Sequence, residues 1–104
     1  MEKVQLKVDE KGFGHFYIVE NDEQIGEMEI SISGPNLTVY HTEVSEKAEG
    51  KGYAKNLLNE MVDYARKNNL KVIPLCPYVH AQFRRHPQEY SDVWNKERAQ
   101  KPGN

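Results

Sequence analysis

The sequence of 104 residues has little of what marks several large classes of protein. Its single cysteine, Cys76, excludes an internal disulfide framework and a cysteine-rich zinc site. No apolar run approaches the roughly 18 residues needed to cross a bilayer, and the start lacks a signal peptide's apolar region. The net charge of −2 argues against a general nucleic-acid binder, because such domains usually carry a basic excess. We therefore expect a cytoplasmic protein that binds neither membrane nor nucleic acid.

The composition indicates one folded domain. Hydrophobic residues make up 38% of the chain and charged residues 29%, which is typical of a globular rather than a disordered protein. A chain of this length has room for one core and not for two. We expect residues 1–98 to form this domain, as a monomer or weak dimer, and residues 99–104 to form a frayed polar tail.

Four strand-like runs come first. Apolar and polar residues alternate over 4–8 and over 27–32, which is the period of half-buried strands. The run 15–20 is rich in strand-favouring residues, and a Gly34-Pro35-Asn36 turn leads into a fourth run over 37–44. Short connections favour antiparallel neighbours. The first 44 residues therefore predict a four-stranded antiparallel meander.

A helix is predicted next, from about Gly52 to Asn68, because apolar residues recur there at helical spacing. Residues 71–76 predict a fifth strand, which a helical crossover usually places parallel to the strand before the helix. Within it, Pro74 has no N–H for a ladder and is expected at an edge or a bulge. Two short helices, over 77–85 and 89–98, complete the predicted fold.

The loop between the fourth strand and the helix contains Gly50-Lys51-Gly52. A helix that begins in such a loop has unpaired N–H groups and the positive end of its dipole there, which favours an anion, most often phosphate. The glycines let the backbone approach that anion. The loop matches neither a Walker loop, which needs Ser or Thr at Gly52, nor the dinucleotide motif, which needs glycine at Lys55. A glycine turn that only starts a helix is the alternative.

This loop carries a family resemblance. The hexapeptide Glu49-Gly50-Lys51-Gly52-Tyr53-Ala54 resembles the coenzyme A pyrophosphate loop of the GNAT acetyltransferases, Gln/Arg-x-x-Gly-x-Gly/Ala, although Glu49 departs from its first position. Further elements follow the order of the small, minimal GNAT-like family of predicted acetyltransferases of the YjdJ type: Tyr40-His41-Thr42-Glu43-Val44, Ile73-Pro74-Leu75-Cys76-Pro77-Tyr78-Val79, His86-Pro87 and Tyr90. The chain resembles that family over nearly its whole length.

The resemblance implies an α+β fold with a mixed sheet, whose fourth and fifth strands splay apart to admit the pantetheine arm of acetyl-CoA. It also implies an N-acetyltransferase that moves acetyl from acetyl-CoA to a primary amine, with the acceptor open. An acyl-CoA-binding module with little catalysis is one alternative, because the short chain has little sequence to build an acceptor pocket. A Cys76-dependent thioesterase is another.

Three side chains are candidates for the chemistry: His41, Glu43 and Cys76. The unperturbed pKa of histidine, about 6.5, suits His41 to proton transfer, although a histidine on the core face of Val39 is the alternative. Glu43 is a candidate base or a solvated carboxylate. Cys76 is a candidate nucleophile, a part of the site's wall, or a small buried hydrophobe. The resemblance also implies that a backbone N–H near residues 43–45 polarises the thioester carbonyl.

The candidate cofactor-binding residues lie in the strand end, the glycine loop and the following helices. Lys51, Lys55 and the Arg84-Arg85 pair are candidates for the phosphates, with a solvated helix face as the alternative for the arginines. Tyr78 and Phe83 are candidates to pack against pantetheine or adenine, or to fill the core. The full set is Val44, Ser45, Glu49, Gly50, Lys51, Gly52, Tyr53, Ala54, Lys55, Tyr78, Phe83 and Arg84.

Overall fold

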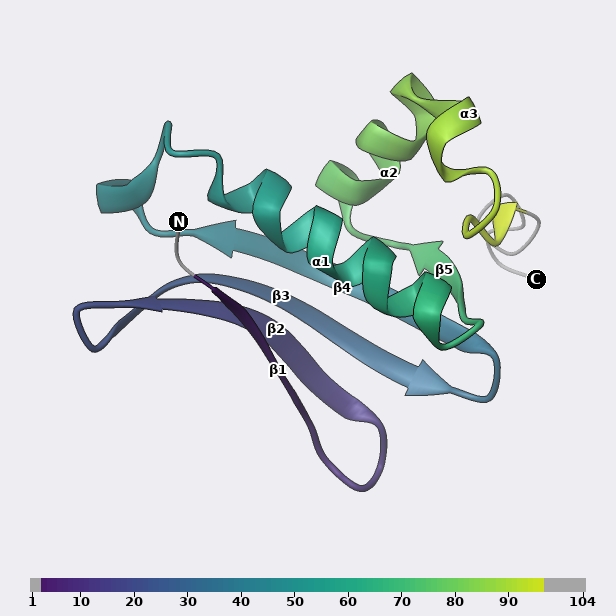
Figure 1. The fold of residues 1–104 in the computed structure, drawn as a ribbon, viewed down its shortest axis with the longest axis horizontal. Coiled ribbons are helices and arrows are strands. Elements are labelled where there is room, and N and C mark those ends of the chain that lie inside the picture. The colour runs from purple at the N-terminus through teal and green to yellow at the C-terminus, as the bar shows by residue number, and fades with distance from the viewer. Residues whose placement is uncertain (1–2, 97–104) are drawn as a thin grey trace.

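The computed structural model describes residues 3–96, which form a mixed five-stranded sheet and three helices (Figure 1). The strands are β1 (Val4–Val8), β2 (Phe13–Glu20), β3 (Glu23–Ser33), β4 (Asn36–Val44) and β5 (Lys71–Pro74). The helices are α1 (Tyr53–Lys67), α2 (Pro77–Arg85) and α3 (Pro87–Tyr90), and a 3-10 turn spans Glu46–Ala48. The sheet order is β1-β2-β3-β4-β5, antiparallel except for parallel β4 and β5. This confirms the predicted meander and the parallel fifth strand.

The core lies between α1 and one face of the sheet (Figure 1). The apolar side of α1 is fully buried, including Leu57, Leu58 and Met61. It packs against the side chains that β2 and β3 turn to the same side, among them Ile18 and Met28. Within residues 3–96, no helix is long and apolar enough to span a membrane.

The C-terminal part corrects the prediction of a helix over 89–98. Helix α3 ends at Tyr90, and the chain then turns and places Trp94 in a parallel bridge with Val72 of β5. The Val72 amide donates to the Val93 carbonyl at 2.6 Å, and the Asn95 amide donates to the Val72 carbonyl at 2.8 Å. The exposed backbone edge of β5 pairs with this segment, which outweighs the local helical pattern. Residues 97–98 and the predicted tail lie outside the described residues.

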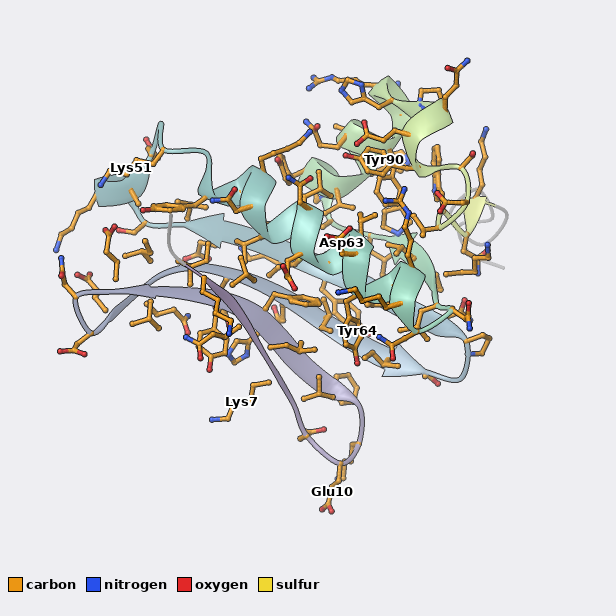
Figure 2. All side chains as sticks on the ribbon, in the orientation of Figure 1. Lys7, Glu10, Lys51, Asp63, Tyr64 and Tyr90 are labelled. Atoms are coloured by element: carbon orange, nitrogen blue, oxygen red, sulfur yellow. The ribbon has the colours of Figure 1, made fainter. Side chains whose placement is uncertain are left out.

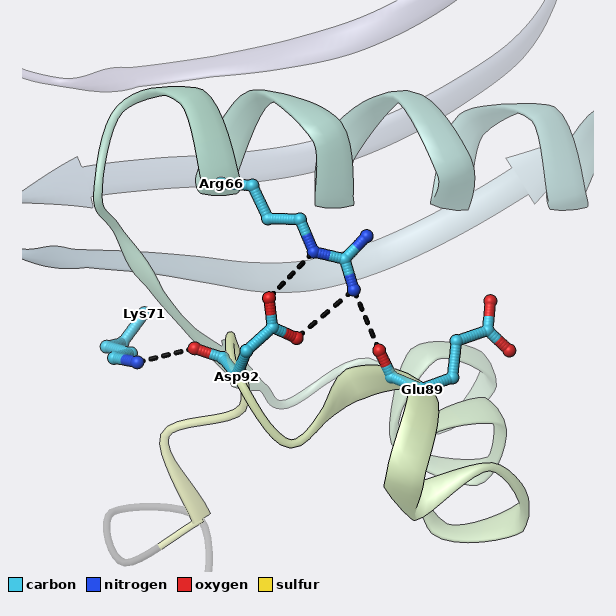
Figure 3. Close-up of polar contacts among 4 residues, drawn as sticks. All are labelled: Arg66, Lys71, Glu89 and Asp92. Atoms are coloured by element: carbon cyan, nitrogen blue, oxygen red, sulfur yellow. Dashed lines mark hydrogen bonds and ion pairs between the residues drawn. The ribbon is translucent and has the colours of Figure 1, made fainter.

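Arg66 ties this segment to the end of α1 (Figure 3). Its Nε and Nη2 atoms donate to the two carboxylate oxygens of Asp92 at 2.8 and 3.1 Å, and Nη2 also donates to the Glu89 carbonyl at 2.7 Å. Lys71 Nζ donates to the Asp92 carbonyl oxygen. The hydrogen bond from Arg66 lowers the pKa of the Asp92 carboxyl.

We expect Asp92→Asn to lower the free energy of unfolding near neutral pH and to matter less in acid. Because the folded-state pKa of Asp92 is lowered, its contribution is present above the unfolded pKa and is lost as pH falls through the folded pKa. The side chains of Arg66 and Asp92 are 40% and 56% exposed, so we expect a loss of only about 0.2–1 kcal/mol. Urea denaturation from about pH 7 down to about pH 2 measures this difference. Glu60→Gln, at an exposed position of α1, is the control, and a pH-independent difference for Asp92→Asn contradicts the assignment.

Candidate active site

The candidate site is built on the end of β4 that β5 does not cover. The parallel ladder joins Asn36 with Lys71 and ends at the pair Val39 and Pro74. Beyond that pair β4 continues to Val44, and its register there is with β3. The Val72 amide donates to Val93 on the side away from β4, so alternation along β5 directs the Pro74 nitrogen away from β4 as well. The Leu75 amide, which the same alternation would direct to β4, donates instead to the Ile73 carbonyl at 3.1 Å, and the pairing stops there. As predicted, the two strands are no longer paired at Val44.

Cys76 lies just beyond this ladder. The fifth strand ends at Pro74 and not at the predicted Cys76, which instead precedes α2 as its N-cap residue. The Cys76 amide donates to the Val39 carbonyl at 2.9 Å, and this bond holds the start of α2 beside β4. The thiol is buried, and its Sγ atom lies 3.3 Å from Thr42 Oγ1. The thiol is therefore next to the uncovered edge of β4.

Tyr78, in the first turn of α2, is a half-buried neighbour of this thiol. Burial raises the pKa of the Tyr78 phenol, and negative charge on Cys76 raises it further. The phenol therefore keeps its proton at neutral pH and is a potential proton donor near Cys76.

A β-bulge at Tyr40 turns His41 away from the core. Tyr40 is an extra residue between the pairs Val39–Ile30 and His41–Glu29. Such a residue shifts the alternation of side chains along the strand. The alternative that places His41 on the buried face of Val39 is therefore wrong, since Val39 is fully buried and the His41 side chain is 59% exposed.

His41 and Glu43 form a pair on the outward face of β4. The Nε2 atom of His41 lies 3.0 Å from Oε1 of Glu43, and the Glu43 side chain is 72% exposed. The carboxylate orients the imidazole, so the pair can accept a proton from a molecule on this face. Thr42, between them, points to the opposite face, where it meets Cys76.

Of the three amides predicted to offer a donor, that of Val44 faces the uncovered edge. The Ser45 amide donates to the Ile25 carbonyl of β3 at 2.8 Å, so it is not available to a ligand. The Ser45 hydroxyl accepts from the Lys47 amide. Bonds alternate along an antiparallel ladder, so the Glu43 amide points to β3 as well. The same alternation directs the Val44 amide to the side that β5 no longer covers.

The glycine loop leads into α1 through two left-handed residues. Gly50 has φ +83° and Gly52, the N-cap of α1, has φ +79°, a region that favours glycine. A Cβ atom at either position would meet nothing within 4 Å, so the loop surface is open. No side chain caps α1, and its first turn holds no acidic residue. The amides of Ala54 and Lys55 lie beyond the reach of the helix's own carbonyls, which suits them to an anion.

The other predicted contact residues are divided among the loop surface, the core and the far end of α2. Lys51 is exposed on it (Figure 2), and so is Glu49 before it. The Tyr53 ring is buried, and the Tyr53 hydroxyl donates to Glu20 Oε2 at 2.9 Å. The Tyr53 side chain is therefore part of the core. Phe83 also fills the core, the alternative to a ligand contact. Arg84 is exposed in the last turn of α2, about two helical turns from Cys76.

A family model described as GCN5-related N-acetyl-transferase matches residues 15–93. The chain belongs to this family, GNAT. Its fold agrees with that of a GCN5-like protein from Staphylococcus aureus, which is 29% identical with a TM-score of 0.65 over 90% of each chain.

Two longer acetyltransferases share the fold. The ribosomal-protein-S18-alanine N-acetyltransferase from Escherichia coli is 15% identical with a TM-score of 0.58, over 64% of this chain and 43% of that enzyme. Nourseothricin acetyltransferase is 24% identical with a TM-score of 0.55, over 77% of this chain and 52% of its own. The chain thus spans about half the length of these two enzymes. No curated protein matches the sequence.

Proposed function

We propose that this GNAT protein transfers acetyl from acetyl-CoA to a primary amine. One observation carries the proposal: in a member of this family, β4 continues beyond its ladder with β5, and this uncovered stretch holds Thr42, which contacts Cys76 before α2, and then Val44. The open loop at Gly50 and Gly52 and the uncapped start of α1 fit a coenzyme A pyrophosphate. Bound acetyl-CoA would supply an activated acetyl thioester.

Each residue of the site has a proposed task. The amides of Ala54 and Lys55 bind phosphate oxygens, and Lys51 adds positive charge. The Val44 amide donates to the acetyl carbonyl oxygen as negative charge develops there. The pair His41 and Glu43 takes the proton of the incoming amine.

On the other side of β4, Tyr78 and Cys76 have proposed roles near the sulfur of the leaving group. Burial raises the pKa of the Tyr78 phenol and so favours its neutral form, which donates its proton to the leaving thiolate. Cys76 is buried against Thr42, so we assign it to the wall of the site and not to attack on the acetyl group.

Turnover of acetyl-CoA with and without a panel of primary amines tests the proposal. We expect release of free thiol to require an amine and to equal the amount of acetylated amine formed. Release that does not need an amine would instead indicate a thioesterase. Tight acetyl-CoA binding with no release under either condition would indicate a binding module.

The assignment of Cys76 gives a separate prediction. We expect Cys76→Ser to keep amine-dependent turnover within about threefold of the wild type, because a wall residue forms no bond to acetyl. After incubation with labelled acetyl-CoA, a quenched digest should contain no acetylated Cys76 peptide. An acetyl-Cys76 peptide together with loss of turnover in Cys76→Ser contradicts the wall role and favours a covalent route.

A further inference from the structure

The face of the sheet opposite α1 carries no helix within residues 3–96 (Figure 1). We call it the open face and define it by outward side chains of β2, β3 and β4: Phe13, His15, Glu27, Glu29, Tyr40, His41 and Glu43. Figure 2 shows Lys7 of β1 pointing away from the helices as well, at the edge of this face. The face includes the exposed His41 and Glu43 pair, so it borders the candidate site.

The carboxylates of the open face have only histidines as basic neighbours in its central strands: Glu27 Oε2 lies 3.7 Å from His15 Nδ1, and Glu43 Oε1 lies 3.0 Å from His41 Nε2. Glu27 and Glu43 are direct cross-strand partners, and their side chains are 40% and 72% exposed. Directly opposed side chains on one face have Cβ atoms about 4.5–5.5 Å apart, where like charges destabilise the pair. Glu29 lies beside them, opposite His41. The sequences of β3 and β4 contain neither lysine nor arginine, and a histidine neutralises a carboxylate only when it is protonated, so a permanently charged cation from outside would relieve this repulsion.

Two hollows flank these carboxylates. One, of about 270 Å³, is lined by residues that include Glu27, Glu43 and Ser45. The other, of about 290 Å³, is lined by Phe13, Gly14, Glu29, Ile30 and Tyr40. Phe13 is 56% exposed and Tyr40 is 40% exposed, and aromatic rings of this kind bind the ammonium group and the apolar stem of lysine.

We infer that the open face binds the acetyl acceptor, and that this acceptor is a lysine-rich polypeptide segment. The inference rests on the proposed function, because it names the substrate class of that reaction. The carboxylates complement lysine, and a lysine amine on this face meets His41 beside the strand edge that presents the Val44 amide.

The two hollows favour a polypeptide over other occupants. They lie on either side of the Glu27 and Glu29 stretch, so an extended chain spans both, whereas a small amine fills one. A second copy of this chain would bring the same carboxylates against each other across a symmetric interface, which charge repulsion disfavours.

The test uses a dye-labelled synthetic peptide of alternating lysine and glycine and the full chain. Fluorescence polarisation gives the peptide Kd, turnover gives its KM, and calorimetry gives the coenzyme A Kd. We expect Glu27→Lys and Glu29→Lys each to raise the peptide Kd and KM by about tenfold or more, with a smaller effect for Glu27→Gln. The coenzyme A Kd should stay within about twofold, because neither residue belongs to the glycine loop. Glu60→Lys, the same charge change on exposed α1, should leave peptide binding unchanged.

The outcomes separate this inference from the function on which it rests. If coenzyme A binds normally but charge reversal at Glu27 and Glu29 leaves peptide binding and KM unchanged, the open face is not the acceptor surface. If spermidine is acetylated and the peptide is not, the acceptor is a small amine and the inference is wrong. If the wild type binds no coenzyme A, the proposed function itself fails.

Discussion

Replacing Gly52 with valine is expected to weaken coenzyme A binding by about 100-fold, which corresponds to roughly 2.7 kcal/mol. Gly52 has φ +79° at the start of α1, and a side chain in the left-handed region costs about 1–2 kcal/mol. The strained loop would shift to relieve this cost, and the Cβ branch would stand on the open surface that the phosphates approach. The amides of Ala54 and Lys55 would then lose their alignment. Calorimetry with coenzyme A measures the effect.

Gly34→Val is the matched control for Gly52→Val. Gly34 also has a positive φ, +56°, and a Cβ there also meets nothing within 4 Å, but it lies in the β3–β4 turn at the other end of β4. We expect similar decreases in melting temperature for the two variants, and a decrease in coenzyme A affinity for Gly52→Val alone. Equal coenzyme A affinity in the two folded variants would contradict the assignment of the glycine loop to the coenzyme A site.

Replacing Phe83 with alanine is expected to lower the free energy of unfolding by about 3–5 kcal/mol. Phe83 is fully buried and stacks on Tyr90 at a centroid distance of 4.7 Å, with Trp94 edge-on at 5.7 Å. Removing the ring leaves a cavity where α2 meets the C-terminal segment, so the loss is a large share of the roughly 5–15 kcal/mol typical of a domain. Urea denaturation of wild type and variant measures it.

Leu75→Ala is the control for Phe83→Ala. Leu75 is 57% exposed between β5 and α2, so its truncation should change stability by no more than about 0.5 kcal/mol. A loss below about 1 kcal/mol for Phe83→Ala would contradict the core position of this ring.

Local sequence patterns were enough to predict most of the sheet and α1. The alternation of apolar and polar residues in β3 and the apolar spacing of α1 each indicate an element with one buried face. Both elements lie where these patterns predict them. The crossover rule then predicted the parallel β5, but the end of that strand at Pro74 and not at Cys76 was not predicted.

The orientation of His41 could not be predicted because it depends on one residue of register. A period of two places His41 with Val39, and only the pairing of β4 with β3 reveals that Tyr40 is bulged. Nothing in the residues around Tyr40 sets it apart from an ordinary strand position. The bulge moves the candidate base from the core to the open face, so it decides on which side of the sheet the proposed acceptor binds.

The end of the chain was mispredicted for a different reason. The apolar spacing of Tyr90, Val93 and Trp94 suits a helix, and the first two are indeed buried. Their burial is achieved by a turn and an extended segment, because the edge of β5 offers hydrogen bonds to Val93 and Asn95. A pattern of buried residues does not distinguish a helix from a turn and an extended segment unless the position of the neighbouring strand is known.

Titration of the isotope-labelled chain with coenzyme A, followed by amide chemical shifts, tests the central claim most directly. The account predicts that the largest shifts fall on three segments, residues 40–44, 50–55 and 76–78, which form the strand edge, the glycine loop and the start of α2. Shifts that leave these segments unchanged, or that centre on the hollow lined by Arg66, Lys71 and Asp92, would contradict it.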